Sequence, residues 1–282
     1  MAAFLSDSNP KTITLREDFH SLRTPIQFHM EVPSDQVIQG TNDDATASKL
    51  HAVNRGYWVD PYIRHFCFSR TPKSPEISRG YFVRTQAFKA ITMSFIKHNH
   101  GECQVVNLGA GSDTLYFILR EANLLPRKFV EVDLGYNVMR KIAIMKNRKL
   151  FPDSENLPVP TESSRGDTTA IQCAAGATAD TSSTEDAGSR RTAFHAGPYH
   201  IFAFDLRQPV ESLIERLCDT TSNGCGLSRT SPTLFLAECV LVYMPAAQTT
   251  QLLRGLATNF SSAAFLHYEQ AGIQSDLSFS YH

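Results

Sequence analysis

Two glycines and a carboxylate stand at a spacing that is typical of nucleotide-like ligand sites. Gly109 and Gly111 follow the short apolar run 104–108. Glycines let a ligand approach the backbone closely, and the N-terminus of a following helix offers free N–H donors. Asp133 ends the next apolar run, 24 residues after Gly109, where a carboxylate can accept hydrogen bonds from both hydroxyls of a ribose.

Two further carboxylates follow apolar runs in the same way. Asp205 comes directly after the run 200–204, and Glu238 follows the run 233–237. Open parallel sheets bind their ligands at the carboxyl ends of the strands. Three carboxylates at such ends suit a cofactor with ribose hydroxyls, an adenine amine and a cationic amino acid moiety. Any one of them alone is more often an ordinary helix cap or surface charge.

The glycine loop favours a methyl donor over a dinucleotide. In the pattern G-x-G-x-x-G of dinucleotide-binding proteins, the third glycine is replaced here by Thr114, which serves a pyrophosphate less well. S-adenosylmethionine (AdoMet) is therefore preferred to a nicotinamide or flavin cofactor. A purely structural turn stays open as well, because strand-to-helix turns often use glycine.

An alternation of strands and helices would bring these side chains to one edge. Strands are expected at 104–108, 128–132, 200–204, 233–237 and 263–267, and helices at 112–121, 137–148, 209–218 and 246–260. A further helix is expected to begin at Ser74-Pro75 and to lead into the first strand. The alternation predicts an α/β fold with a doubly wound, mostly parallel sheet.

The chain is expected to form one domain with two irregular parts. Residues 1–40 contain Pro10, Pro25 and Pro33 without a sustained period, which indicates an irregular or disordered arm. The domain would occupy 41–282. Within it, residues 151–198 are rich in Ser, Thr, Ala, Gly and Asp, which predicts a disordered insertion.

Composition argues against nucleic acid and membranes as partners. The 27 Lys and Arg residues balance 28 Asp and Glu residues, so there is no general basic field for phosphates. The sequence shows no signal peptide and no apolar stretch of about eighteen residues. We expect a monomer in the cytoplasm or also in the nucleus.

The cysteines and histidines give no recognisable metal pattern. The six cysteines form no C-x-x-C pair, so we expect free thiols in a reducing compartment. His98 and His100 have no third ligand at a suitable spacing. No metal site is expected.

Five sequence blocks together resemble the leucine carboxyl methyltransferase family. They are GYWVDPYI (56–63), SPEISRGYFVR (74–84), VVNLGAGSDT (105–114), EVD (131–133) and AECVLVYM (237–244). The resemblance covers about residues 40–270 and implies a class I AdoMet-dependent methyltransferase fold, which is Rossmann-like. It also implies methyl transfer from AdoMet to the α-carboxylate of the C-terminal leucine of the protein phosphatase 2A catalytic subunit, giving a methyl ester.

The resemblance also assigns residues to the cofactor. By motif, its contacts fall on Lys49, Arg84, Gly109, Asp133, Asp205, Leu206 and Glu238. Asp133 is assigned to the ribose and Asp205-Leu206 to the adenine. Arg84 and Tyr243 are the candidate catalytic residues, with Tyr243 facing the substrate. Which of Lys49 and Arg84 holds the cofactor carboxylate, and which the substrate, stays open.

Three aromatic residues precede these positions. Tyr57, Trp58 and Tyr81 could line a leucine pocket or face the sulfonium, but aromatic side chains at such spacings more often belong to the core. The reaction itself demands few catalytic groups. A C-terminal carboxylate has a pKa of about 3.3 to 3.7 and is ionised at neutral pH, so alignment and exclusion of water would suffice.

The sequence departs from the family after its fifth predicted strand. Family members continue with a helix and an antiparallel pair, so we expect this sheet to lack its last two strands and to leave 263–267 as an unpaired edge. Two alternatives stay open. One is a truncated, inactive AdoMet-binding regulator, and the other is a related tRNA or small-molecule carboxyl methyltransferase.

Overall fold

One seven-stranded sheet organises the protein. The computed structural model describes residues 2–5, 34–67, 71–151, 192–221 and 223–269. The strands run in the order β1-β7-β6-β2-β3-β5-β4. Their bounds are β1 (Ala2–Leu5), β2 (Gln104–Leu108), β3 (Lys128–Asp133), β4 (Ala193–Ala196), β5 (Tyr199–Ala203), β6 (Thr233–Glu238) and β7 (Ala263–Tyr268). The central five are parallel, whereas β1 and β4 pair antiparallel at the two edges.

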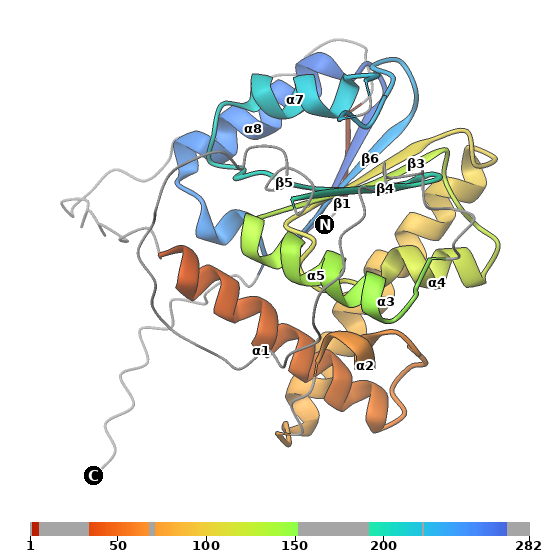
Figure 1. Ribbon diagram of the computed structural model, residues 1–282, viewed down its shortest axis with the longest axis vertical. Coiled ribbons are helices and arrows are strands. Elements are labelled where there is room, and N and C mark those ends of the chain that lie inside the picture. The colour runs from red at the N-terminus through yellow and green to blue at the C-terminus, as the bar shows by residue number, and fades with distance from the viewer. Residues whose placement is uncertain (1, 6–33, 68–70, 152–191, 222, 270–282) are drawn as a thin grey trace, which may run out of the picture.

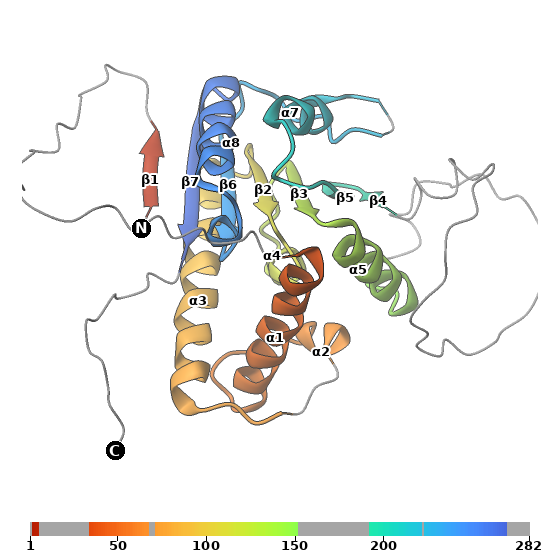
Figure 2. The ribbon, with the colours of Figure 1, turned by 90° about the vertical axis from the view of Figure 1, so that its left-hand side faces the viewer.

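Helices cover both faces of the sheet. They are α1 (Asp35–Asn54), α2 (Ile63–Phe66), α3 (Pro75–His98), α4 (Leu115–Glu121), α5 (Gly135–Asn147), α7 (Val210–Cys218) and α8 (Ala246–Asn259), with a 3-10 turn at Leu241–Tyr243. Figure 1 shows α7 and α8 on one face, and α3, α4 and α5 on the other. In Figure 2, α1 and α2 lie beyond one end of the central strands, beside α3.

The predicted α/β class with a mostly parallel, doubly wound sheet is confirmed. All five residues of β2 are buried, as expected for a strand covered on both faces. The Ser74 side chain accepts a hydrogen bond from the backbone N–H of Ile77 at 3.3 Å, and Pro75 begins α3. In α7 the buried positions are Val210, Leu213, Ile214 and Leu217, which is the spacing of an amphipathic helix.

Two expectations about the chain's organisation were wrong for the residues that the structure describes. Within the arm predicted at 1–40, Ala2–Leu5 forms β1 and α1 begins at Asp35. Within the insertion predicted at 151–198, Phe151 is buried and Ala193–Ala196 forms β4. Short edge strands are hard to predict from the sequence pattern, because they form only when a neighbouring strand is present to pair with them. The rest of the arm and residues 152–191 lie outside the described residues.

The edge expected to be unpaired is occupied. β1 runs antiparallel to β7, with Ala2 opposite Leu266 and Leu5 opposite Ala263. The backbone groups of β7 on this side therefore have ladder partners. The partner strand comes from the opposite end of the sequence, which no local pattern could indicate.

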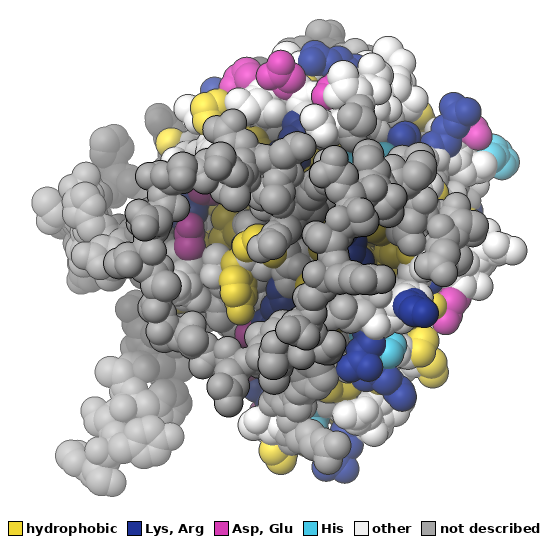
Figure 3. All heavy atoms as spheres, in the orientation of Figure 1, with side chains coloured by type: hydrophobic (Ala, Val, Ile, Leu, Met, Phe, Trp, Pro, Cys, Tyr) yellow, Lys and Arg dark blue, Asp and Glu magenta, His cyan; other side chains and the backbone are white. Residues whose placement is uncertain are grey.

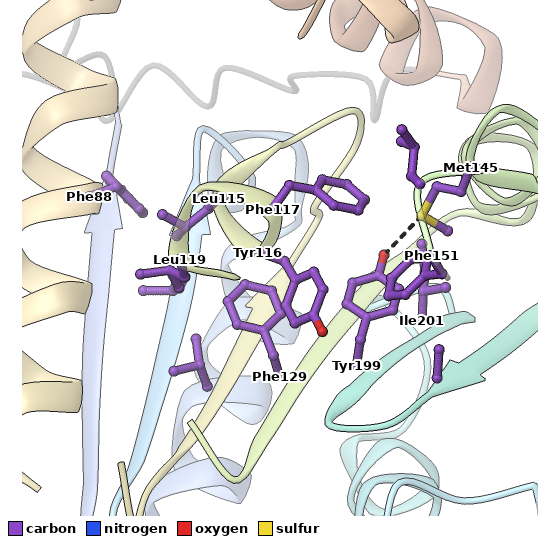
Figure 4. Close-up of a cluster of buried hydrophobic side chains, with 14 of the residues drawn as sticks. Phe88, Leu115, Tyr116, Phe117, Leu119, Phe129, Met145, Phe151, Tyr199 and Ile201 are labelled. Atoms are coloured by element: carbon purple, nitrogen blue, oxygen red, sulfur yellow. Dashed lines mark hydrogen bonds between the residues drawn. The ribbon is translucent and has the colours of Figure 1, made fainter. Parts of the chain in front are cut away.

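Aromatic side chains fill the core between the sheet and helices α4 and α5. Tyr116 and Tyr199 lie with ring centroids 4.5 Å apart, and Phe151 stacks on Tyr116 at 5.8 Å. Figure 4 shows these rings together with Phe129, and the Tyr199 hydroxyl pointing towards the Met145 sulfur, 3.7 Å away. The packing fixes α4 and α5, whose N-terminal ends follow β2 and β3.

A buried ion pair lies beside this aromatic core. Lys141 Nζ is 2.6 Å from Glu131 Oε2, and each side chain is 1% exposed. Lys141 also donates to the backbone carbonyl of Asp113 at 2.7 Å, and the Tyr199 hydroxyl donates to Glu131 at 2.6 Å. Burial raises the pKa of Glu131 although Lys141 opposes this. The pair ties α5 to β3 and to the loop after β2.

On the face shown in Figure 3, the described Lys and Arg side chains lie in separate groups, with acidic side chains at the top over α7. None of the described helices is both long enough and apolar enough to cross a bilayer.

Replacing Lys141 by methionine should destabilise the protein by about 3 to 5 kcal/mol, because Glu131 would stay buried without its counterion. Urea unfolding of the wild-type and Lys141→Met proteins measures the difference. The double variant Lys141→Met/Glu131→Leu should recover most of the loss, since it buries no unpaired charge. A single variant within 1 kcal/mol of the wild type would contradict the prediction.

Candidate active site

A cavity of about 480 Å³ opens at the carboxyl ends of the parallel strands. It lies where the strand order reverses, between β2 and β6, which is where open α/β sheets bind ligands. Its size lies in the range of about 300 to 1,000 Å³ of small-molecule pockets. The structure brings every site residue predicted from the sequence to its wall: Lys49, Arg84, Gly109, Asp133, Asp205, Leu206, Glu238 and Tyr243.

The glycine loop is packed so closely that side chains would not fit. Gly109 has φ +66°, and a Cβ there would lie 2.5 Å from Val240 Cγ2. Gly111 also has positive φ, and a Cβ there would collide with Asn42 Oδ1. That same oxygen accepts a hydrogen bond from the backbone N–H of Ser112 at 2.8 Å. Helix α1 thus holds the loop from one side and Val240 from the other.

Asp133 supports the loop and faces the cavity. Its Oδ2 accepts from the backbone N–H of Gly111 at 2.6 Å, and its Oδ1 accepts from Leu134 N at 2.7 Å and Asn137 Nδ2 at 2.8 Å. Burial raises the pKa of Asp133, although these three hydrogen bonds favour the ionised form. Since an ionised carboxylate offers about four acceptor sites, one is left for a ligand hydroxyl.

Glu238 is shared by two cations from different helices. Lys49 Nζ of α1 lies 3.0 Å from Oε1 and 3.2 Å from Oε2, and Arg84 Nε of α3 donates to Oε1. Burial acts to raise the pKa of Glu238, but Lys49 and Arg84 outweigh it, so that this pKa lies below its usual value. For Lys49, burial acts to lower the pKa, but the negative charge of Glu238 outweighs burial, so that the pKa of Lys49 is raised. One formal positive charge is left over for a ligand.

Two of the three aromatic residues considered from the sequence pack away from the main cavity. Tyr57 and Trp58 lie with Phe82 at centroid distances of 6.2 and 6.3 Å. Tyr81 lines the cavity, and the guanidinium carbon of Arg84 is 5.1 Å from its ring centroid. Tyr81 therefore supports Arg84 by a cation–π contact.

The remaining predicted residues form the opposite wall. Arg207 donates to the Asp205 carboxylate from Nε at 2.8 Å and from Nη2 at 2.7 Å, and these bonds lower the pKa of Asp205. Leu206 is buried and lines the cavity. Tyr243 lies in the 3-10 turn after β6. Their assignment to adenine and substrate stays a prediction.

Sequence reasoning missed several residues that shape the cavity. Asn137 stands four residues after Asp133 and contacts it, which is a local signal at the start of a helix. Its Oδ1 is buried and has no hydrogen-bond partner in the described part of the protein. Asn42 and Val240 meet the glycine loop only through the fold, so no local spacing marks them. Arg207 stands two residues after Asp205, but only the structure shows that its guanidinium pairs with that carboxylate.

The side chains of the cavity suit binding and orientation. Among the described lining residues there is no histidine, and the arrangement offers carboxylates, three cations and hydrogen-bond donors. A ligand with hydroxyls, an amine and a carboxylate would match these groups. Chemistry that needs only alignment and a dry cavity is favoured.

Comparison with known proteins shows which family this chain resembles. A model of the family described as leucine carboxyl methyltransferase matches residues 37–257. Leucine carboxyl methyltransferase 1 of Bos taurus is 36% identical over 257 residues, which cover 90% of this chain and 69% of that protein. The Caenorhabditis elegans protein of that name is 37% identical over 245 residues, covering 85% and 65%. The chain thus spans about two thirds of the length of these relatives.

A second group of relatives has a different name. The tRNA wybutosine-synthesizing protein 4 of Rattus norvegicus is 31% identical over 239 residues, which cover 83% of this chain and 30% of that protein. The similarity therefore concerns less than a third of that protein's length.

Changing Glu238 to glutamine should destabilise the protein by about 3 to 5 kcal/mol at pH 7, because Lys49 and Arg84 would lose their shared carboxylate. The folded-state pKa of Glu238 is lowered, so its stabilisation is complete above the unfolded-state pKa of about 4.3. It is lost as the pH falls through the lower folded-state pKa. The wild-type and Glu238→Gln proteins should therefore converge in stability towards acid pH.

Denaturant unfolding from neutral to acid pH measures this convergence. Glu215→Gln is a suitable control because Glu215 is exposed on α7, and exposed substitutions usually change stability by less than about 0.5 kcal/mol. A stability difference between the wild-type and Glu238→Gln proteins that stays constant across pH would refute the role of the Glu238 charge.

Proposed function

The chain belongs to the leucine carboxyl methyltransferase family, a family of methyltransferase enzymes, and on that premise we propose that it methylates the α-carboxylate of a C-terminal leucine with AdoMet. The product is a methyl ester. As the protein substrate we propose the tail of the protein phosphatase 2A catalytic subunit, which is what the resemblance of the five sequence blocks implies. The observation that carries the proposal is this cavity, in whose wall Lys49 and Arg84 share Glu238 and keep one uncompensated positive charge.

The residues of the cavity fit AdoMet. Gly109 and Gly111 line the cavity in a loop that is held between Val240 and Asn42 and has no room for side chains. The free acceptor site of Asp133 suits a ribose hydroxyl, and the Asn137 side chain holds this carboxylate in place. Asp205 and Leu206 combine a carboxylate with an apolar wall, which suits an adenine with its exocyclic amine. Lys49 or Arg84 would hold the amino acid carboxylate.

Methyl transfer needs alignment more than proton transfer here. When bound, the sulfonium of AdoMet supplies an activated methyl group. The attacking carboxylate is already ionised at neutral pH, since its pKa is about 3.3 to 3.7. The chain therefore has to hold the carboxylate with Arg84 or Lys49, to orient it, and to exclude water. Tyr243 lies in the same wall and is proposed to contact the substrate.

The two alternatives are less well supported. The similarity to the tRNA wybutosine-synthesizing protein covers only 30% of that protein, whereas the leucine carboxyl methyltransferases match over most of their length. An inactive AdoMet-binding regulator would have the same cavity. Methyl transfer to a defined substrate is what separates it from an enzyme.

Incubation with labelled AdoMet should place a base-labile label on the phosphatase catalytic subunit that ends in leucine. A version of the subunit without that leucine should stay unlabelled, because the acceptor would be missing. AdoMet binding without any label would instead favour the inactive regulator. Label on both versions of the subunit would refute the C-terminal carboxylate as the acceptor.

Asp133→Ala should weaken AdoMet binding roughly 10- to 100-fold, the value of one to two charge-assisted hydrogen bonds. Isothermal titration calorimetry measures the dissociation constant directly. Asp133→Asn keeps the shape of the side chain and tests the charge alone, while Glu211→Gln on exposed α7 serves as control. Equal affinities of wild-type and Asp133→Ala proteins would contradict the assignment to the ribose.

A further inference from the structure

Three metal-ligating side chains meet at the other end of the sheet. They are His195 on β4, His200 on β5 and Cys225 in the loop after α7, and one ligand atom of each lies within 4.8 Å of the others. Figure 2 shows α7 and its following loop beside the β5–β4 edge. None of the three lines the main cavity. A function of this cluster is therefore independent of methyl transfer.

The backbone fixes the two histidines as neighbours. His195 and His200 are opposite each other in the antiparallel β4–β5 pair, so their side chains share one face of the hairpin. The two Nδ1 atoms are 2.7 Å apart. His200 is buried, and its face of the sheet packs against α7.

A tight loop brings the thiol to this face. Cys225 N donates to the carbonyl of Arg216 at 3.3 Å, and Gly226 N donates to the carbonyl of Asp219 at 2.8 Å. Gly226 has φ +64°, and a Cβ at Gly224 would collide with Asp219. These contacts hold the loop against the end of α7 and leave Cys225 only 1% exposed.

The hydrogen bonds fix the protonation pattern of the two imidazoles. Lys128 Nζ is 3.1 Å from His200 Nε2. Because an ammonium group can only donate, this nitrogen accepts, and the proton of neutral His200 lies on Nδ1. His200 Nδ1 therefore donates to His195 Nδ1. A metal ion would take the place of this one shared proton.

The distances suit a small ion. Around a three-coordinate ion with angles near 120°, nitrogen and sulfur ligands at ~2.0 to 2.3 Å lie roughly 3.5 to 4.0 Å apart. The present atoms lie within 4.8 Å of one another and the two imidazole nitrogens lie closer than that range. Small side-chain rotations would bring all three around one centre.

The surrounding charges discriminate between metals. Lys128 and Arg216 act on both His195 and Cys225, and Asp219 on Cys225. Two cations and one exposed carboxylate leave the surroundings positive. Zn²⁺ with one thiolate would add a further positive charge, whereas a monovalent ion with one thiolate would add none. Thiolate and imidazole are ligands of copper(I) as well as of zinc.

We propose that His195, His200 and Cys225 form a three-coordinate site for copper(I), which would fasten the β4–β5 hairpin to the loop after α7. Binding forms two Cu–N bonds and one Cu–S bond, and releases the thiol proton of Cys225. The Nδ1 proton of His200 moves to Nε2 through solvent. Lys128 is only partly buried, so its ammonium can turn away from Nε2 towards water.

The test is a competition titration of the full chain, reduced and without oxygen, with copper(I) and a chromophoric copper(I) chelator. The wild type should retain one equivalent against the chelator. Cys225→Ser and His195→Ala should lose it, whereas Cys67→Ser, a control for the other thiols, should keep it. Copper(I) should also raise the thermal midpoint of the wild type and not that of Cys225→Ser.

Lys128→Met provides a variant whose effect cannot come from misfolding. Removing the ammonium group should raise the copper(I) affinity about tenfold, in keeping with one nearby charge at partial exposure. Zn²⁺, titrated in parallel, should bind more weakly than copper(I). The proposal is overturned if Cys225→Ser binds as well as the wild type, if Lys128→Met binds no more tightly, or if Zn²⁺ binds more tightly than copper(I).

Discussion

The neutralisation of Glu238 is the interaction on which the cavity depends. Its side chain is only 12% exposed, and a carboxylate buried to this extent needs counterions. Both cations come from helices that precede the first parallel strand: Lys49 from α1 and Arg84 from α3. Since α1 and α3 also pack on each other, this charge fastens them across the carboxyl ends of the strands. The same contact that stabilises the fold therefore builds one wall of the site.

Unusual backbone conformations at two neighbouring strand ends complete the geometry. Gly109 after β2 and Cys239 after β6 both have positive φ, a conformation that is costly for Cys239 and acceptable for glycine. The turn at Cys239 is held by its N–H, which donates to the carbonyl of Tyr268 at 2.8 Å. It places Val240 against Gly109. Because Val240 packs directly on Gly109, only a residue without a side chain fits at this edge of the cavity.

The sequence was informative wherever the signal was local. Parallel strands appeared as apolar runs, and Gly109, Asp133 and Glu238 could be placed at their ends, because a strand end is a position in sequence as well as in space. β1 could not be predicted, since it forms by pairing with β7, which lies far away in the chain. Asn42 likewise meets the glycine loop only through folding. The family resemblance supplied Lys49, whose own surroundings in the sequence show nothing unusual.

On the proposed function, the charges near Glu238 limit how the substrate can be held. Lys49 and Arg84 carry two positive charges against one negative charge, so this group can balance one ligand carboxylate. The methyl donor and the peptide each bring a carboxylate. The methyl donor also carries two positive charges, its ammonium group and its sulfonium, and attraction of the second carboxylate to the sulfonium would be strong in a site that excludes water. Electrostatics would then draw the attacking oxygen towards the methyl group, which explains how the cavity can work without a general base.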